Sequence, residues 1–302
     1  MIVLFLLFLI LVTVFAKVSE SSANPKWLLN KPADFTNSLS TVQNLDEYVA
    51  LIPERRKGAA YHFADDEDYN LIDFLFYGKV GGVIMEMGAC DGTVYTGSKS
   101  VTFEPLGWKR ILIDANVKWI SRLKSENKQA MSVWAAVCEY ETVVHYAKTR
   151  NYLVSGVLEF MSDDFMKKYH PTQYFYRGTA EFNHTGWTAQ LSHQLYEIPC
   201  IPLTKILSYA EIDHISAFIL DVEGGEWSVL QSIDWDSVIF DVIAVETDPS
   251  ERPPGYANKI ATFMEQKGYR CIAMKHGRNT WFAHKSFVPS LKAGLSSPFN
   301  FD

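Results

Sequence analysis

Four acidic residues follow apolar stretches of the sequence that have the character of short β-strands. They are Glu86, Asp114, Asp221 and Glu246. The carboxyl ends of parallel strands meet at one edge of a sheet, and doubly wound sheets bind their ligands there. We therefore expect these four carboxylates to line a single crevice, where they can accept hydrogen bonds from hydroxyl groups or pair with a cationic group.

The first of these acids begins a glycine motif, Glu-Met-Gly-Ala-Cys-Asp-Gly at residues 86–92. Gly88 and Gly92 allow close approach of the backbone to a ligand, and Glu86 or Asp91 can pair with a cation. The Gly-x-x-x-Gly spacing differs from Gly-x-Gly-x-x-Gly and disfavours a pyrophosphate cofactor. The alternative is an ordinary glycine turn after a buried strand.

Two further motifs place acids at strand ends. Asp114 ends the stretch Ile-Leu-Ile-Asp, where an acid hydrogen-bonds ribose hydroxyls in nucleotide-binding folds, although it could instead cap the next helix. In the run Asp-Val-Glu-Gly-Gly-Glu at 221–226, Asp221 is predicted to face the crevice. Glu226 suits the N-terminus of the following helix.

Periodicity predicts the elements that must position these residues. Strands are expected at 83–87, 110–113, 131–137, 143–146, 198–201, 217–220, 238–245, 270–274 and 280–283. Helical spacing occurs at 65–77, 98–103, 117–126, 226–233 and 256–267. The alternation predicts an α/β fold with a mainly parallel sheet, helices on both faces and a C-terminal antiparallel hairpin. The expected organisation is an apolar segment 1–16, a polar stalk or lead-in 17–60, a domain 61–287 with an irregular insertion 140–213, and a tail 288–302.

Composition narrows the class of partner. The chain has 302 residues, a net charge of −7 and a sequence pI near 5.6, and it contains no Lys/Arg-rich run. Nucleic-acid binders usually carry a basic patch, so we expect no nucleic-acid partner and favour a neutral, small-molecule or glycan ligand. The sequence does not indicate the oligomeric state.

The N-terminal run at 2–16 is apolar throughout apart from Thr13. Its length suits a signal-peptide core or a short single-pass membrane anchor, with a buried helix as the third alternative. We therefore expect a secretory-pathway protein, secreted or anchored in the ER or Golgi membrane. The sequon at Asn183 agrees with a luminal glycoprotein.

The cysteines do not indicate a metal. They lie at 90, 138, 200 and 271 without a CxxC pair, so a zinc site is disfavoured and no metal is expected. Cys138 and Cys200 each border a strand-like run and form the favoured disulfide pair. Four buried thiols are the alternative.

The motifs in this order resemble those of the FkbM-type methyltransferases. The resemblance spans about residues 80–285 and includes the glycine motif at 86–92, Ile113-Asp114-Ala115-Asn116, Ala135-Ala136-Val137, Ser155-Gly156-Val157, Cys200-Ile201-Pro202-Leu203 and Leu220-Asp221-Val222-Glu223-Gly224. It implies a Rossmann-like class I methyltransferase fold and S-adenosyl-L-methionine as cofactor. Many members of the family are thought to O-methylate sugar hydroxyls or related small groups.

The resemblance also implies roles for individual residues. Cofactor-binding positions would be Glu86, Gly88, Asp91, Gly92, Asp114, Asn116, Ala136 and Asp221, with Gly88 and Gly92 beside the methionine portion and Asp114 on the ribose. Asp221 and Glu223 would lie near the transferred methyl. The sequence departs from the family at Asp114-Ala115-Asn116, where Glu-Pro-Asn is common, and at Ile219, where many members carry Lys or Ser.

Methyl transfer to a sugar hydroxyl calls for a general base. Asp221 or Glu223 is the first choice, and a histidine of the insertion is the second: His145, His170, His184 or His193. Aromatic residues of the insertion could form an acceptor lid or simply cover the sheet edge: Tyr169, Tyr174, Phe175, Tyr176, Phe182 and Trp187. The competing functional hypothesis is a secretory-pathway adaptor that keeps the fold without the activity.

Overall fold

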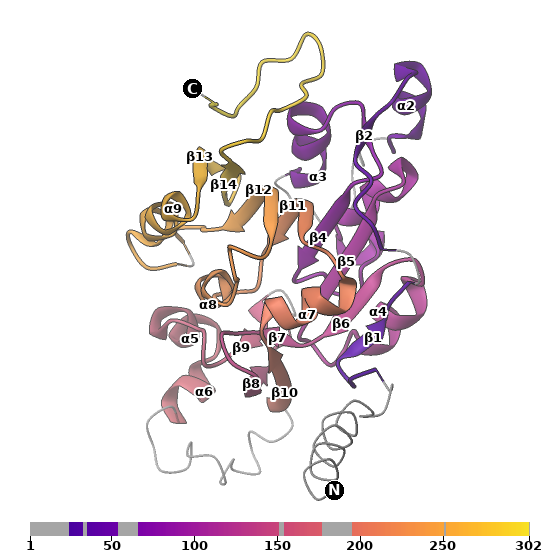
Figure 1. Cartoon of the computed structure of the whole chain (residues 1–302). Helices are drawn as coiled ribbons and strands as arrows, with labels where there is room; N and C mark the ends of the chain where they lie inside the picture. Colours follow the sequence, from indigo (N-terminus) through magenta and orange to yellow (C-terminus); the bar gives the residue numbers. More distant parts are fainter. Residues whose placement is uncertain are drawn as a thin grey trace, which may run out of the picture.

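The computed structural model describes residues 24–32, 35–53, 66–150, 154–176, 195–250 and 252–301. Its centre is an eight-stranded sheet (Figure 1). In spatial order the strands are β1 (Leu28–Asn30), β6 (Met131–Trp134), β5 (Lys109–Asp114), β4 (Val83–Met87), β11 (His214–Leu220), β12 (Ile239–Glu246), β14 (Asn279–His284) and β13 (Tyr269–His276).

The sheet is mixed, and the chain belongs to the predicted α/β class. Strands β6, β5, β4, β11 and β12 pair in parallel, whereas β1, β14 and β13 join antiparallel. From β4 the chain builds the sheet outward through β5 and β6, and it later returns to the other side of β4 with β11 and β12. The strand order therefore reverses between β4 and β11, which is where such sheets bind ligands.

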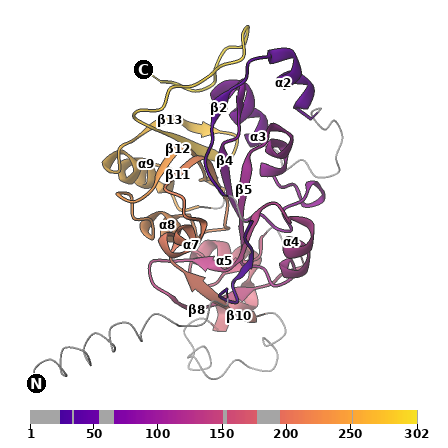
Figure 2. The same cartoon turned by 45° about the vertical axis from the view of Figure 1, so that its right-hand side comes forward.

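Alternation along the strands divides the core between the two faces of the sheet. Val83, Met85 and Met87 of β4 point to one face, and Ile84 points to the other, because successive strand residues face opposite sides. Figure 2 shows helices on both sides of the sheet. The first face is covered by α7 (Leu203–Ala210), α8 (Glu226–Gln231) and α9 (Tyr256–Gln266). The opposite face is covered by α2 (Leu45–Leu51), α3 (Glu67–Asn70), the π-helix η1 (Leu71–Leu75), the 3-10 helix η3 (Ser100–Leu106) and α4 (Ile120–Glu126).

The predicted irregular insertion 140–213 contains regular structure of its own. A four-stranded sheet lies below the central sheet in Figure 1 and consists of β7 (Ala136–Val137), β10 (Leu195–Ile201), β8 (Thr142–Ala147) and β9 (Gly156–Val157). Helices α5 (Asp163–Tyr169) and α6 (Pro171–Tyr176) lie between β9 and β10 in the chain. Cys138 and Cys200 form a disulfide, so the favoured pairing is confirmed. Of the other two cysteines, Cys90 is half-buried and Cys271 is exposed.

The described parts of the lead-in and the tail both pack on the domain. Trp27 and Leu28 are buried in the main core while β1 extends the sheet, so the described part of 17–60 is not a free stalk. The short strands β2 (Ser40–Thr41) and β3 (Lys79–Val80) pair with each other as an antiparallel two-stranded sheet. The 3-10 helix η2 (Val94–Thr96) follows β4 in the chain. In the tail, Phe299 is buried against Trp281, and apolar burial of this kind explains why the segment is fixed.

The predicted localisation is corrected. Secretion or anchorage in the ER or Golgi membrane was expected from the apolar segment 1–16, which lies outside the described residues, as does the sequon at Asn183. Within the described part of the chain, no helix combines the length and apolar character needed to cross a membrane. The secretory-pathway and membrane assignments are accordingly withdrawn.

Candidate active site

A cleft of about 520 Å³ lies where the turns after β4, β5 and β11 meet the second sheet, and we name it the main cleft. Most of the site residues predicted from the sequence line it: Glu86, Gly88, Asp114, Asn116, Ala136, Asp221 and Glu223. Three separate strand ends thus meet in one space at the point where the strand order reverses. Asp91, Gly92 and Glu246 are not among the described residues that line this cleft.

Gly88 occupies a position that only glycine fits. Its φ is 87°, and a Cβ added there would lie 1.8 Å from the carbonyl oxygen of Asp221. The backbone NH of Asp221 also donates to the carbonyl of Met87 at 3.1 Å. The ends of β4 and β11 are therefore in backbone contact, with no room for a side chain between them.

Glu86 organises the rim of the cleft. Its buried carboxylate accepts hydrogen bonds from the Ser98 hydroxyl at 2.6 Å and from the backbone NH groups of Lys99 at 2.9 Å and Ser100 at 3.1 Å. A carboxylate with this many donors is already satisfied by the protein. Glu86 thus fixes the loop that precedes η3, which carries Lys99.

Asp91 and Gly92 hold the turn after β4 from behind the cleft. The Asp91 carboxylate accepts from the NH and hydroxyl of Thr93 at 2.9 and 2.7 Å, and it forms an ion pair with Arg122 at 2.8 Å. The carbonyl of Gly92 accepts from the buried Arg110 at 2.6 Å. These contacts support the turn, whereas the sequence had suggested direct cofactor contact for both residues.

Asp114 also lines the cleft, at the end of β5, and is held by backbone donors. The NH groups of Cys90 and Asn116 each donate to one of its carboxylate oxygens at 2.7 Å. Burial raises the pKa of Asp114 to about 7 in spite of these two hydrogen bonds. The Cys90 residue that supplies one donor has φ 52°, a conformation that L residues seldom adopt.

Asn116 and Tyr146 complete this end of the cleft. Asn116 is buried, and its side-chain carbonyl accepts from the NH of Lys118 at 3.0 Å. Tyr146 projects from the second sheet, and burial raises the pKa of its phenol well above the usual value. The phenol therefore stays neutral and can offer its O–H to a ligand.

Asp221 has different surroundings, because cations lie beside it. The ammonium of Lys99 is 3.6 Å from its carboxylate, and the guanidinium of Arg278 is 3.9 Å away. Burial alone would raise the pKa of Asp221, but these charges and Arg252 outweigh it and leave that pKa below its ordinary value. Asp221 is consequently ionised and a weak base.

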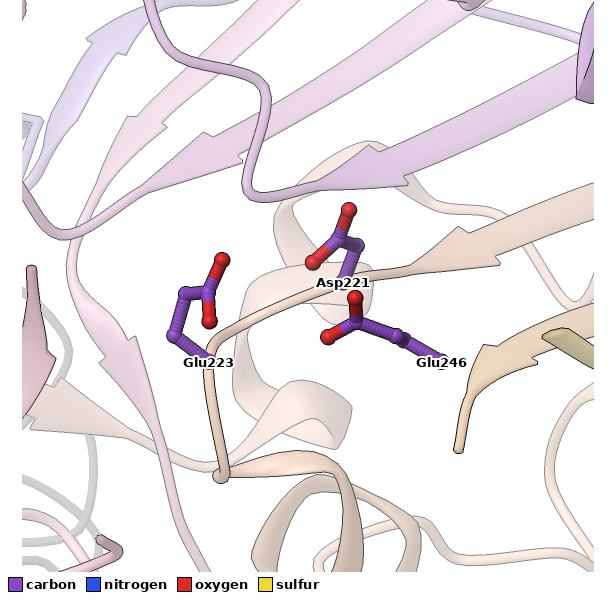
Figure 3. A group of neighbouring side chains, drawn as sticks. All are labelled: Asp221, Glu223 and Glu246. Atoms are coloured by element: carbon purple, nitrogen blue, oxygen red, sulfur yellow. The ribbon is translucent and has the colours of Figure 1, made fainter. Parts of the chain in front are cut away.

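Glu223 and Glu246 flank Asp221, and Figure 3 shows the three carboxylates turned toward one another. Their oxygens lie within 4.8 Å of each other, a spacing that could hold a cation. Glu246 already pairs with Arg278 at 2.9 Å and with Arg252, and burial followed by the charge of Asp221 raises its pKa. Protein cations therefore compensate this cluster, and we assign no metal to it.

The turn that carries Glu223 is fixed by Glu226. One oxygen of this buried carboxylate accepts from the NH groups of Val222 at 3.3 Å and Gly224 at 3.1 Å. The same carboxylate binds Arg252 at 2.9 Å and the Tyr256 hydroxyl at 3.1 Å. These contacts hold Glu223 at φ 54° on the wall of the main cleft.

The comparisons with known proteins identify the family. The model of the methyltransferase FkbM domain matches residues 86–271, which include every acid described above. This chain belongs to the FkbM methyltransferase family. The resemblance of the motifs is thereby confirmed, since all of those quoted above lie inside the matched range.

Two solved structures are similar to this FkbM chain at low identity. The methyltransferase FkbM of Methylobacillus flagellatus KT has a TM-score of 0.37 and 11% identity over 67% of this chain, which spans only 43% of that structure. The precorrin-6y C5,15-methyltransferase of Geobacter metallireducens GS-15 has a TM-score of 0.29 and 10% identity, covering 85% of this chain and 97% of that one. No curated protein matches the chain. The family assignment rests on the domain match alone.

Sequence reasoning missed Lys99, Arg278 and Tyr146 in this FkbM domain. Lys99 precedes η3, Arg278 lies in the turn between β13 and β14, and Tyr146 belongs to the second sheet. No local motif marks them, because each reaches the cleft only through the tertiary fold.

The two candidate histidines within the described residues are not placed to act as the base. His145 bonds Glu159 at 2.6 Å and His170 bonds the carbonyl of Val154 at 2.7 Å, and neither lines the main cleft. Burial lowers the pKa of His170. His184 and His193 lie outside the described residues, as do Phe182 and Trp187 of the predicted aromatic lid. Of that lid, Tyr169 lines the cleft.

Proposed function

We propose that this FkbM-family chain is an S-adenosyl-L-methionine-dependent methyltransferase that O-methylates a sugar hydroxyl or a similar small acceptor. The observation that carries the proposal is the meeting of Asp114 and Asp221 in one cleft with opposite electrostatic surroundings. The cofactor consists of a nucleoside joined to a zwitterionic amino acid, so its binding cleft needs two different ends. One end must accept hydrogen bonds from ribose, and the other must pair with both an ammonium and a carboxylate.

The residues fit this cofactor. Each oxygen of Asp114 accepts one backbone NH and keeps a lone pair for a ribose hydroxyl. At the other end, the anionic Asp221 suits the ammonium of the methionine portion, and Lys99 or Arg278 suits its carboxylate. The bound cofactor would supply an activated methyl group on its sulfonium.

The chain's own residues then orient the acceptor and remove its proton. Glu223 is the better base, because Asp221 is held ionised by cations and its pKa is lowered. Proton transfer from the acceptor hydroxyl to a Glu223 carboxylate oxygen would accompany attack, and a positioned base of this kind contributes about 10²–10⁴-fold. Asp221 keeps its negative charge beside the cationic centre.

Calorimetric titration of the full chain with S-adenosylmethionine and S-adenosylhomocysteine at pH 8 tests the proposal. We expect both to bind and to stabilise the fold, by about 2.7 kcal/mol when the ligand is at 100 times Kd. Absence of both heat and thermal stabilisation would refute the enzyme hypothesis and favour a non-catalytic adaptor that has kept the fold.

The assignment of the base has a separate test. With a labelled methyl donor and a panel of glycosides, Glu223→Gln should reduce turnover by about 10²-fold or more and leave donor affinity within about twofold. The exposed Glu265→Gln on α9 is the matched control and should turn over normally. Equal turnover of Glu223→Gln and Glu265→Gln would exclude Glu223 as the base.

A further inference from the structure

A second cleft of about 540 Å³ adjoins the main one, and we name it the side cleft. Its walls come from α5 and the residues before it, from α8, and from the loop that leads into α9. Aromatic and proline residues dominate the wall: Phe160, Phe165, Trp227, Pro253, Pro254 and Tyr256. Nothing in the proposed cofactor site uses this space.

The two clefts are separated by one turn and one ring. Phe160 lines both of them. Glu223 and Gly225 face the main cleft, whereas Gly224 between them faces the side cleft. A Cβ on Gly225 would approach the Phe160 ring to 3.1 Å, so glycine lets the turn lie against this ring. Phe160 is the residue that the two clefts share, so a ligand whose reacting group lies beside Glu223 would extend past this ring into the side cleft.

The charged side chains around the side cleft already have partners within the protein. Lys259 lies over the Trp227 ring at 3.6 Å. The buried Arg252 forms ion pairs with Glu226 and Glu246, and Glu159 bonds His145. An apolar wall whose charged side chains already have partners favours a neutral ligand over a phosphate or a cation. Sugar and aryl rings fit this description, because both present apolar faces that pack on aromatic side chains.

We propose that the side cleft binds a second ring, linked glycosidically to the sugar that is methylated in the main cleft. This inference rests on the proposed function and makes it narrower, because the acceptor becomes an extended neutral glycoside. The methylated ring lies beside Glu223, and its neighbour packs among Phe160, Trp227 and Tyr256.

The experiment compares one-ring and two-ring glycosides in the presence of S-adenosylhomocysteine. The panel contains methyl glycosides of the common hexoses and deoxyhexoses, the matching methyl disaccharides and the matching 4-nitrophenyl glycosides, with Kd measured by ligand-observed NMR. Wild-type protein should bind at least one two-ring glycoside about tenfold more tightly than its one-ring counterpart, a difference of about 1.4 kcal/mol. The disaccharide and nitrophenyl arms distinguish a sugar neighbour from an aryl one.

Ser228→Phe supplies the blocking variant. Ser228 lines the side cleft from α8, is half-buried, and does not line the main cleft. Its replacement should cancel the two-ring preference and leave the Kd of S-adenosylhomocysteine within about twofold, which also shows that the variant folds. Ser228→Leu, a smaller block, should cancel part of the preference. Ser125→Phe, on the exposed face of α4, is the matched control and should retain it.

The outcomes distinguish failure of the side-cleft proposal from failure of the proposed methyltransferase function. If wild-type protein binds S-adenosylhomocysteine but shows no preference for a second ring, the side-cleft proposal is overturned and the cofactor proposal stands. The same holds if Ser228→Phe retains the preference as Ser125→Phe does. If wild-type protein fails to bind S-adenosylhomocysteine, the proposed function itself is overturned.

Discussion

Asp114 and Asp221 occupy equivalent places in the fold, yet the groups around their carboxylates shift their pKa values in opposite directions. Asp114 is the last residue of the buried strand β5, Asp221 directly follows the buried strand β11, and both line the same cleft. Asp114 is held by two backbone NH groups, and burial raises its pKa to about 7. Asp221 lies beside Lys99 and Arg278, and its pKa is lowered.

The difference shows that position at a strand end does not determine the chemistry of a carboxylate. The donors to Asp114 come from the adjacent turns, one within its own strand-end motif and one within the glycine motif. The cations at Asp221 come from segments distant in sequence. The Asp114 end therefore suits neutral hydroxyl donors, while the Asp221 end suits charged groups.

The largest effect should follow from removing the carboxylate at the ribose end. Asp114→Ala should weaken S-adenosylmethionine binding about 100-fold, because two hydrogen bonds to a charged acceptor are lost. Calorimetric titration at pH 8 measures this. Asp114→Glu, which keeps the charge, should remain within about tenfold of wild type. Binding by Asp114→Ala that equals wild-type binding would remove the ribose role.

Removing a cation tests the opposite end. Lys99→Met should lower the free energy of unfolding by about 2 kcal/mol, because the nearly buried Asp221 loses one of its compensating charges while Arg278 remains. Urea denaturation measures the change. Lys124→Met on the exposed face of α4 is the control and should change stability by less than about 0.5 kcal/mol. Similar losses in the two variants would show that Asp221 does not depend on Lys99.

The largest part of the pH dependence of binding should come from Asp114. Ribose hydroxyls donate to the ionised carboxylate, so affinity should be full above its pKa of about 7 and fall as the pH drops through it. Between pH 8 and pH 6 the ionised fraction, and with it the affinity for S-adenosylmethionine, should decrease about tenfold. Asp221 stays ionised throughout this range. A pH profile of Asp114→Asn that is as steep as the wild-type profile would contradict the assignment.

The smallest effect concerns the backbone, which is strained at both ends of the cleft. Cys90 and Glu223 have φ values of 52° and 54°. Replacing either with glycine should raise the free energy of unfolding by about 0.5 kcal/mol, since relief of the left-handed conformation slightly exceeds the entropic cost of glycine. Thermal unfolding measures both variants. A loss of stability at only one of the two would show that its side-chain packing outweighs the strain.

Local patterns were enough to predict much of the sheet and one end of the site. Strand β4 coincides with the predicted 83–87, and Asp114 lies where its motif indicated. The helix α7 inside the insertion and the edge strand β1 were missed, because α7 has only eight residues and β1 only three, too few to give a clear periodic pattern. Asp91 and Gly92 show a further limit. A motif gives the residue types, but only the folded structure shows that Asp91 pairs with Arg122 and that the carbonyl of Gly92 binds Arg110.

The buried carboxylate of Glu226 affects the spacing between the main cleft and the side cleft. It binds both the turn between the two clefts and, through Arg252 and Tyr256, the loop that walls the side cleft. The distance between the two clefts is then set within the folded protein before any ligand arrives. A two-ring acceptor bound as proposed would span this interval, so discrimination by length would need no movement of the chain.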